Sequence, residues 1–171
     1  SEIDLFFTAL ENIFLKFIQE KTNDTIILLS ADHGQTNVNP QTTFYLNREI
    51  DNIANYLKTN KKGELIVPAG SCRDMFLHVK ENSIMDLSKI LFTKLKGKAE
   101  VYETKMLIKE GFFGPKISKE FMSRVGNLVI LPYAGESVWW YEKEVFEQKH
   151  IGHHGGLTPD EMEIPFLTLS F

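Results

Sequence analysis

The sequence has little cysteine, no long apolar run and no excess of positive charge. Cys72 is the only cysteine, which excludes an internal disulfide and a cysteine-based zinc finger. A lone thiol is typical of a reducing compartment, so we expect a cytoplasmic protein. No apolar run reaches the ~18 residues that a bilayer-crossing helix needs, so the sequence predicts no transmembrane segment.

The balance of charge excludes a strongly basic protein. The 171 residues carry 19 basic and 23 acidic side chains, a formal charge of −4, and the isoelectric point is near 5.7. These values argue against an extended nucleic-acid interface. Apolar residues make up 43% and charged residues 25%, which is typical of a globular domain with a real core.

Several enzyme signatures are also absent. The sequence contains no Walker A loop, no H-E-x-x-H pair and no G-x-S-x-G elbow. His78 occupies the position six residues after Cys72 where a cysteine phosphatase loop has arginine. Cys72 is therefore predicted to be a buried structural thiol rather than a nucleophile.

The chain opens directly on an amphipathic segment, without an initiator methionine. Apolar residues recur there at helical spacing and predict a helix over residues 1–20: Ile3, Phe6, Phe7, Leu10, Ile13, Phe14, Phe17 and Ile18. The apolar stripe is wide, so we expect the helix to be covered on more than one side. A chain that begins flush with such a helix is expected to be part of a longer protein.

The rest of the chain predicts short strands and helices in alternation. The continuous apolar run at 25–29 indicates a strand buried on both faces, as in a parallel sheet covered by helices. The polar stretch 35–43 is expected to be a loop. Helices are predicted at 47–57 (beginning at Asn47), 83–95, 105–110 and 119–124, and strands at 64–67, 74–79, 99–102, 127–132, 137–141 and 164–171.

The segment Asp32-His33-Gly34 is the first candidate site. It follows the predicted strand at 25–29, where open α/β sheets place their ligands. Neighbouring strand residues point to opposite faces, so Asp32 and His33 reach one ion only if the chain turns, which Gly34 permits. Oxygen and nitrogen ligands suit zinc or manganese. The alternative is that Asp32 caps a turn that His33 completes.

A histidine-rich loop is the second candidate. His150, His153 and His154 cluster among glycines, which oppose a helix there but let a loop approach an ion or anion closely. The alternative is a surface loop with incidental histidines. Elsewhere, Arg73 is expected to pair with its neighbour Asp74, and the aromatic run at 138–141 to pack in a core rather than to stack on a base.

Two motifs together point to a family. ADHGQ (31–35) and GHHGGLTPDEMEIPFL (152–167) resemble the C-terminal part of alkaline phosphatase superfamily proteins, closest to the type I phosphodiesterase/nucleotide pyrophosphatase branch. The segments PAGSCRDMFLHV (68–79) and GNLVILPYAGESVWWYE (126–142) resemble microbial, archaeal-type members with an inserted subdomain.

The resemblance implies an α/β fold, the C-terminal part of an alkaline-phosphatase-like α/β/α sheet with an inserted small α+β subdomain. In this interpretation residues 1–43 belong to the core and carry the first metal motif. Residues 44–145 form the insert. Residues 146–171 return to the core with the second metal motif and the last strand.

The resemblance also implies a two-metal phosphodiesterase or phosphatase. Asp32 and His33 would hold one divalent ion and His154 the other, with Gly34, His153 and Gly155 near the site. The ions would be zinc, with manganese as the alternative, and would activate a nucleophile and stabilise phosphoryl charge. The substrate would be a small phosphate ester, with nucleotides among the candidates.

The family's nucleophile and its remaining metal ligands precede the matching segment. Ser30, Thr36 and Ser71 lie near the motifs, but none occupies the nucleophile's position, so no catalytic residue is assigned. We therefore expect an incomplete metal site and a chain that is inactive alone. Its exposed first helix would favour self-association.

Other readings stay open. The chain could instead be a non-catalytic binding or assembly module on the same scaffold, or part of a sibling phosphomutase or sulfatase. The metal hypothesis depends on one geometric prediction, that folding brings the Asp32-His33 pair next to His154.

Overall fold

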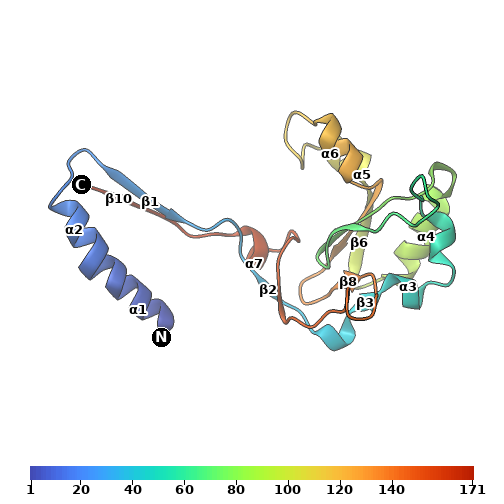
Figure 1. The fold of residues 1–171 in the computed structure, drawn as a ribbon, viewed down its shortest axis with the longest axis horizontal. Coiled ribbons are helices and arrows are strands. Elements are labelled where there is room, and N and C mark those ends of the chain that lie inside the picture. Colours follow the sequence, from blue (N-terminus) through green and yellow to red (C-terminus); the bar gives the residue numbers. More distant parts are fainter. The chain divides into compact units, whose positions relative to one another are not determined.

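The computed structural model describes all residues, Ser1–Phe171. The chain forms two compact units of mixed α/β structure (Figure 1). One unit comprises Ser1–Asp32 with Ile164–Phe171, and the other comprises His33–Glu163. None of the helices combines the length and apolar character that a membrane span requires.

The first unit consists of a helix and a two-stranded ribbon. The helix runs through α1 (Glu2–Ala9), a π-helical segment η1 (Leu10–Leu15) and α2 (Lys16–Gln19). Ser1 caps it by accepting the N–H of Asp4, whose carboxylate accepts in return. Strands β1 (Ile26–Ser30) and β10 (Phe166–Ser170) pair antiparallel, with Leu28 opposite Thr168. The predicted helix and both predicted strands are thus confirmed.

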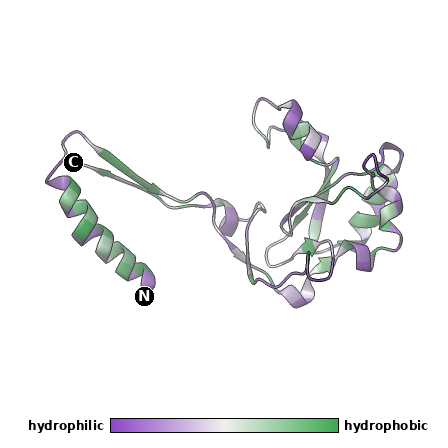
Figure 2. Ribbon diagram, viewed as in Figure 1, coloured by the Kyte–Doolittle hydropathy of each residue, from purple (hydrophilic) through white to green (hydrophobic).

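The expected burial of this unit is wrong for the chain as described. Within this chain β1 pairs with β10 alone, antiparallel, in a two-stranded sheet. Ile26 and Leu28 are 69% and 60% exposed, and no residue of the helix is buried. Figure 2 shows the hydrophobic colouring of both the helix and β1. The apolar pattern is real, but this unit contains no second layer that would cover it.

The second unit is built on a four-stranded antiparallel sheet. Its strand order is β4 (Ala69–Ser71), β5 (Asp74–Leu77), β7 (Leu128–Pro132) and β6 (Ala99–Glu103). Helix α4 (Ile84–Lys94) contributes its apolar stripe to the core, where Leu87 and Leu91 are fully buried with Leu77 and Ile130. The short helices α5 (Thr104–Lys109) and α6 (Lys119–Arg124) complete the unit. Their sequence positions were predicted correctly.

The predicted helix at 47–57 is two shorter pieces. These are α3 (Leu46–Glu49) and the 3-10 turn η3 (Ile53–Tyr56), and Asn52 between them has a left-handed backbone with φ 54°. The apolar residues of the pattern are nevertheless buried, as Ile50 and Leu57 show. The periodicity identified the core residues but not the break between the two helical turns.

Asn47 also has a different role from the predicted helix cap. Its side-chain amide donates to the carbonyl of Tyr141 and accepts the Tyr141 N–H, both at 2.8 Å. The predicted strand at 64–67 is reduced to one bridge between Leu65 and Thr59. β4 occupies a stretch that we expected to be a connection.

Further short elements of this unit lie outside the four-stranded sheet. β3 (Phe44–Tyr45) pairs parallel with β8 (Val138–Trp139). The 3-10 turns η2 (Pro40–Thr42) and η4 (Glu81–Ser83) and the helix α7 (Pro159–Met162) lie in connecting segments. The second unit therefore contains the segment 44–145, proposed as an insert, together with residues 33–43 and 146–163.

Candidate metal centre

The two histidine motifs are joined by a short antiparallel pairing. β2 (Thr36–Asn37) pairs with β9 (Gly152–His153), with Thr36 opposite His153 and Asn37 opposite Gly152. The N–H of Val38 extends the pairing by donating to the carbonyl of Ile151 at 2.8 Å. The loop expected at 35–43 is thus paired in part, and the pairing brings the first motif beside the second.

The imidazole rings of His33 and His154 are stacked. Their centroids are 3.7 Å apart and their planes differ by 18°. The Nδ1 atom of His33 lies 2.8 Å from the carbonyl oxygen of Gly34, which requires Nδ1 to carry the donated hydrogen. A neutral His33 then has its lone pair on Nε2. Of the predicted meeting between the Asp32-His33 pair and His154, the contact of His33 with His154 is found, and the role of all three residues as metal ligands stays a prediction.

His153 has a different environment from its neighbour. Its Nε2 lies 3.2 Å from the carbonyl oxygen of His150 and also contacts the amide of Gln148. Burial lowers the pKa of His153, and the hydrogen bond to the His150 carbonyl opposes that shift only in part. The Nε2 atom of His153 is thus engaged within its own loop, while His154, not His153, stacks on His33.

The donor set suits divalent ions but is small. Nowhere in the chain do three or more His, Cys, Asp or Glu side chains gather closely enough to hold a metal. Asp32 precedes His33 in the sequence and is the last residue of the first unit's opening segment.

A buried ion pair lies behind the second motif. Arg73 donates from Nε to Glu161 Oε1 at 2.9 Å and from Nη2 to Oε2 at 2.8 Å, and the two side chains are 0% and 1% exposed. The Nη1 atom donates to the carbonyl oxygens of Tyr133 (2.8 Å) and Glu136. A buried guanidinium needs such a full set of acceptors.

The expected pairing of Arg73 with Asp74 is therefore wrong. Asp74 instead accepts the backbone N–H and the hydroxyl of Ser71 in the turn between β4 and β5. Burial raises the pKa of Asp74, although these two bonds favour its ionised form. The side chain of Arg73 is instead buried in the unit, where its bidentate partner is Glu161.

Glu161, which pairs with Arg73, is the residue beside the second motif that the sequence pattern did not single out. Its carboxylate also accepts the N–H of Gly156 at 3.0 Å and the hydroxyl of Thr158 at 2.6 Å. Burial opposes its ionisation, but the hydrogen bonds from Arg73, Thr158 and Gly156 outweigh burial and lower the pKa of Glu161 to about 2. The Thr-x-x-Glu spacing at the start of α7 is a helix-start signature that could have singled it out.

Two glycines let the second motif approach these polar pairs. Gly155 has φ +114°, and a Cβ there would lie 2.7 Å from Ser71 Oγ and 2.9 Å from Asp74 Oδ1. A Cβ on Gly156 would lie 2.6 Å from Glu161 Oε2. Ser71 Oγ, whose hydroxyl has its shorter hydrogen bond to Asp74, also lies 3.1 Å from the carbonyl oxygen of His154. The glycines are thus required by close packing beside His154.

The remaining candidates have structural environments. Cys72 is buried, as predicted, and burial raises the pKa of its thiol to about 11, which disfavours the thiolate form of a nucleophile. Trp139 packs edge-on against Phe146, and the guanidinium of Arg48 lies 3.2 Å from the centre of the Tyr141 ring. The aromatic run at 138–141 therefore belongs to the packing of this unit, as predicted.

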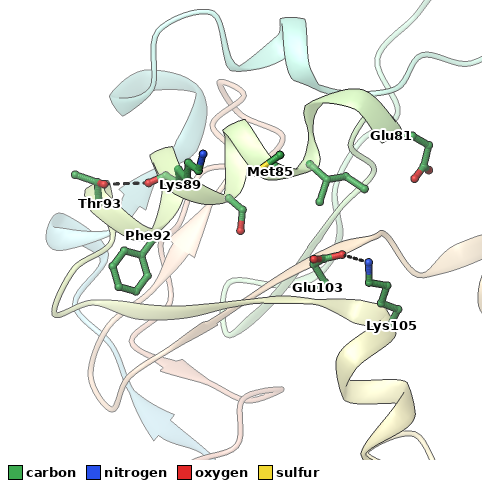
Figure 3. Close-up of a pocket in the computed structure, with 9 residues that line it drawn as sticks. Glu81, Met85, Lys89, Phe92, Thr93, Glu103 and Lys105 are labelled. Carbon is green, nitrogen blue, oxygen red and sulfur yellow. Dashed lines mark hydrogen bonds and ion pairs between the residues drawn. The ribbon is translucent and has the colours of Figure 1, made fainter.

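Two surface pockets of this unit have linings that include neither His33 nor His154. A groove of about 750 Å³ runs between α4 and β6, with Met85 and Phe92 on its helical side and the Glu103–Lys105 ion pair on the other (Figure 3). A pocket of about 90 Å³ adjoins Gly155 and is lined by apolar side chains that include Phe113. The smaller pocket is well below the size of a typical ligand site.

Comparisons with solved structures confirm the fold. Human ectonucleotide pyrophosphatase/phosphodiesterase 5 matches with a TM-score of 0.65 and 16% identity, over 99% of this chain and 40% of that chain. Phosphonoacetate hydrolase from Sinorhizobium meliloti 1021 in complex with phosphonoformate matches with a TM-score of 0.56 and 14% identity, over 84% of this chain and 36% of that chain.

A further match is an inactive variant of murine ectonucleotide pyrophosphatase/phosphodiesterase 5 in complex with AMP. Its TM-score is 0.53 and its identity 16%, over 86% of this chain and 34% of that chain. The chain thus spans about 40% or less of the solved chains described here. These folds share the α/β class that the two motifs implied. A comparison with curated proteins finds no match.

The sequence profile described as type I phosphodiesterase/nucleotide pyrophosphatase matches residues 12–157. This range covers most of the 171 residues and includes both Asp32-His33 and His154. The chain belongs to the type I phosphodiesterase/nucleotide pyrophosphatase family.

Proposed function

We propose that this chain forms part of a metal-dependent phosphodiesterase or phosphatase that hydrolyses phosphate esters with two divalent ions. The stacked pair His33 and His154, 3.7 Å apart, is the observation that carries the proposal. Family membership supports the same chemistry. The AMP bound to the murine relative makes a nucleotide the first substrate class to test.

The proposed ligands are three side chains of this chain. Asp32 and His33, adjacent in the sequence, hold one ion, and His154 holds the other. The hydrogen bond from His33 Nδ1 to the Gly34 carbonyl orients the ring and leaves Nε2 as its ligating nitrogen. When bound, the ions polarise the phosphoryl group and stabilise its developing charge. Imidazole and carboxylate donors favour zinc, with manganese as the alternative.

The site is proposed to be incomplete in this chain. Three ligands divided between two ions fall short of tetrahedral coordination. We infer that the nucleophile and the other ligands belong to the part of the relatives' fold that this chain does not span, and that the chain alone is inactive. Segments 1–43 and 146–171 would form the motif-bearing core and 44–145 the insert. The expected cytoplasmic location and archaeal-type origin stay predictions.

The test compares the chain with a version extended to the length of its relatives. The extended protein should contain metal and hydrolyse bis-p-nitrophenyl phosphate, whereas the 171-residue chain should not. Asp32→Ala and His154→Ala should each abolish turnover and reduce bound metal, because each removes a proposed ligand. His78→Ala, in a pocket lined by neither motif, is the control. Full turnover and metal content in both ligand variants would contradict the proposal.

A second candidate function, assembly, rests on the apolar surface of the first unit. Ile3, Phe14 and Phe17 are 67%, 47% and 60% exposed on one helix. Such a surface favours association, so we propose that copies of the isolated chain self-associate through it. Sedimentation velocity should show concentration-dependent oligomers that Phe14→Ser with Phe17→Ser converts to monomer. A sibling phosphomutase or sulfatase would be recognised by turnover of its own substrate class in the extended protein.

A further inference from the structure

Glu161 contacts the backbone of both histidine motifs. Its main-chain carbonyl accepts the N–H of Gly34, the residue after His33, at 2.9 Å. Its carboxylate accepts the N–H of Gly156, two residues after His154, at 3.0 Å. One residue thus holds the two segments whose imidazoles are stacked.

The orientation of the Glu161 carboxylate is fixed by Arg73. The two parallel bonds of 2.9 and 2.8 Å use both carboxylate oxygens. Arg73 is itself held by the carbonyl of Tyr133 at 2.8 Å, and neither member of the pair has contact with solvent beyond 1% of its side-chain surface. The carboxylate cannot rotate without breaking bonds that water does not replace.

Both glycines approach this residue and its helix too closely to admit a side chain. A Cβ on Gly34 would lie 2.0 Å from the carbonyl oxygen of Asp160, and one on Gly156 would lie 2.6 Å from Glu161 Oε2. The backbone of each motif therefore lies directly on the start of α7. A shift of Glu161 would move both motifs.

We propose that Glu161, fixed by Arg73, is the positioning residue that sets His33 against His154 and so determines the spacing of the two metal ligands. The part of this inference that concerns ions rests on the proposed function. The part that concerns the two rings does not. Outer contacts of this kind orient ligands and are worth about 10–100-fold in metal affinity.

The first experiment measures the rings without metal. Cross-relaxation between the ring protons of His33 and His154 is measured by NMR in the metal-free 171-residue chain. Glu161→Gln should lose this contact, because a glutamine cannot accept both bonds from Arg73. Glu81→Gln, which removes a surface ion pair with Lys58 on another part of the unit, should retain it. A folded Glu161→Gln chain with the contact intact would overturn the proposal.

The second experiment separates positioning from general destabilisation. Leu87→Ala, in the core, provides a variant with a lower melting temperature but an intact Glu161. This variant should keep the ring contact and the Zn²⁺ affinity of the wild type by calorimetry, whereas Glu161→Gln should weaken zinc at least about tenfold. Equal losses of ring contact and of Zn²⁺ affinity in Leu87→Ala and Glu161→Gln would show that Glu161 acts only through overall stability, and would overturn the inference.

A third variant covers the case in which Glu161→Gln does not fold. The pair Arg73→Met with Glu161→Leu removes both buried charges, so it avoids an unpaired ion, and it should fold but lack the ring contact. Retention of the contact in this folded pair would overturn the inference. A further outcome separates the two proposals. If the wild-type chain does not bind Zn²⁺ but its ring contact still depends on Glu161, the metal role of this chain is contradicted. The positioning role of Glu161 is then still supported.

Discussion

The imidazole of His33 lies almost flat against that of His154, although the two residues come from opposite parts of the sequence. The β2–β9 pairing sets the register of their segments, and Glu161 accepts the backbone N–H groups of Gly34 and Gly156. A local pairing of two residues per strand is weak alone. In the positioning role proposed for Glu161, its buried pair with Arg73 adds the rigidity that this pairing lacks.

Metal binding by the isolated chain should be weak and dependent on pH. We expect calorimetry with Zn²⁺ to give low affinity near neutral pH, because the chain supplies few ligands. Lowering the pH from about 7.5 to about 5.5 should weaken binding further, since protons compete for the imidazole nitrogens. His154→Ala should reduce the signal, and His78→Ala should not. Tight stoichiometric binding would show a more complete ligand set than the structure contains.

Glu161 should make the second unit sensitive to acid. Its pKa in the folded chain is about 2, below the ordinary value of 4.5, so its ionised form is stabilised by folding. The contribution of the ionised Glu161 to the free energy of unfolding is complete above about pH 4.5 and is lost as the pH falls toward 2. Urea unfolding at several pH values should show the wild-type advantage over Glu161→Gln shrinking across that range. An advantage that stays constant down to pH 2 would contradict the assignment.

Removing one member of the buried pair should cost far more than removing a surface partner. Arg73→Met leaves the Glu161 carboxylate charged and enclosed, so we expect a loss of about 3–5 kcal/mol in the free energy of unfolding. The pair Arg73→Met with Glu161→Leu should recover most of this loss. Lys58→Met, whose partner Glu81 is exposed, should change stability little. Equal effects of Arg73→Met and Lys58→Met would contradict the structure.

Elements with strong local patterns were predictable from the sequence. The apolar spacing of α4 and the continuous apolar run of β7 identify buried positions such as Leu87 and Ile130 directly. The helix expected from Asn47 was less accurate, because a single left-handed residue, Asn52, divides it without changing the apolar spacing. Burial of β1 was predicted from a pattern that reflects a neighbouring layer, and this unit does not contain that layer.

The candidate site was predictable only in part. The sequence motifs identified His33 and His154, and the family match contains both. Arg73 looked like the partner of Asp74 because sequence reasoning favours neighbours, whereas Glu161 is its partner 88 residues away. Such pairs depend on the three-dimensional packing of the sheet, the motif loop and α7. The Thr-x-x-Glu spacing at the start of α7, a helix-start signature that begins at Thr158, was the local sequence feature that pointed to Glu161.

Gly34 should be the least replaceable residue of the first motif. A Cβ at this position would lie 2.0 Å from the backbone carbonyl oxygen of Asp160, an overlap that side-chain rotation cannot relieve. Gly34→Ala should therefore break the bond from the Gly34 N–H to the Glu161 carbonyl, separate the His33 and His154 rings, and cost about 1–3 kcal/mol. Thermal unfolding and the NMR ring contact measure the two effects.

Gly152→Ala is the matched control for Gly34, since it lies in the partner motif. The nearest atom to its added Cβ is the side-chain Oε1 of Gln35 at 3.3 Å, which can move aside. This variant should keep the stability and the ring contact of the wild type. If Gly34→Ala had the same stability and the same ring contact as Gly152→Ala, the close packing of the first motif on α7 would be incorrect. Contact with Glu161 would then not determine the position of His33.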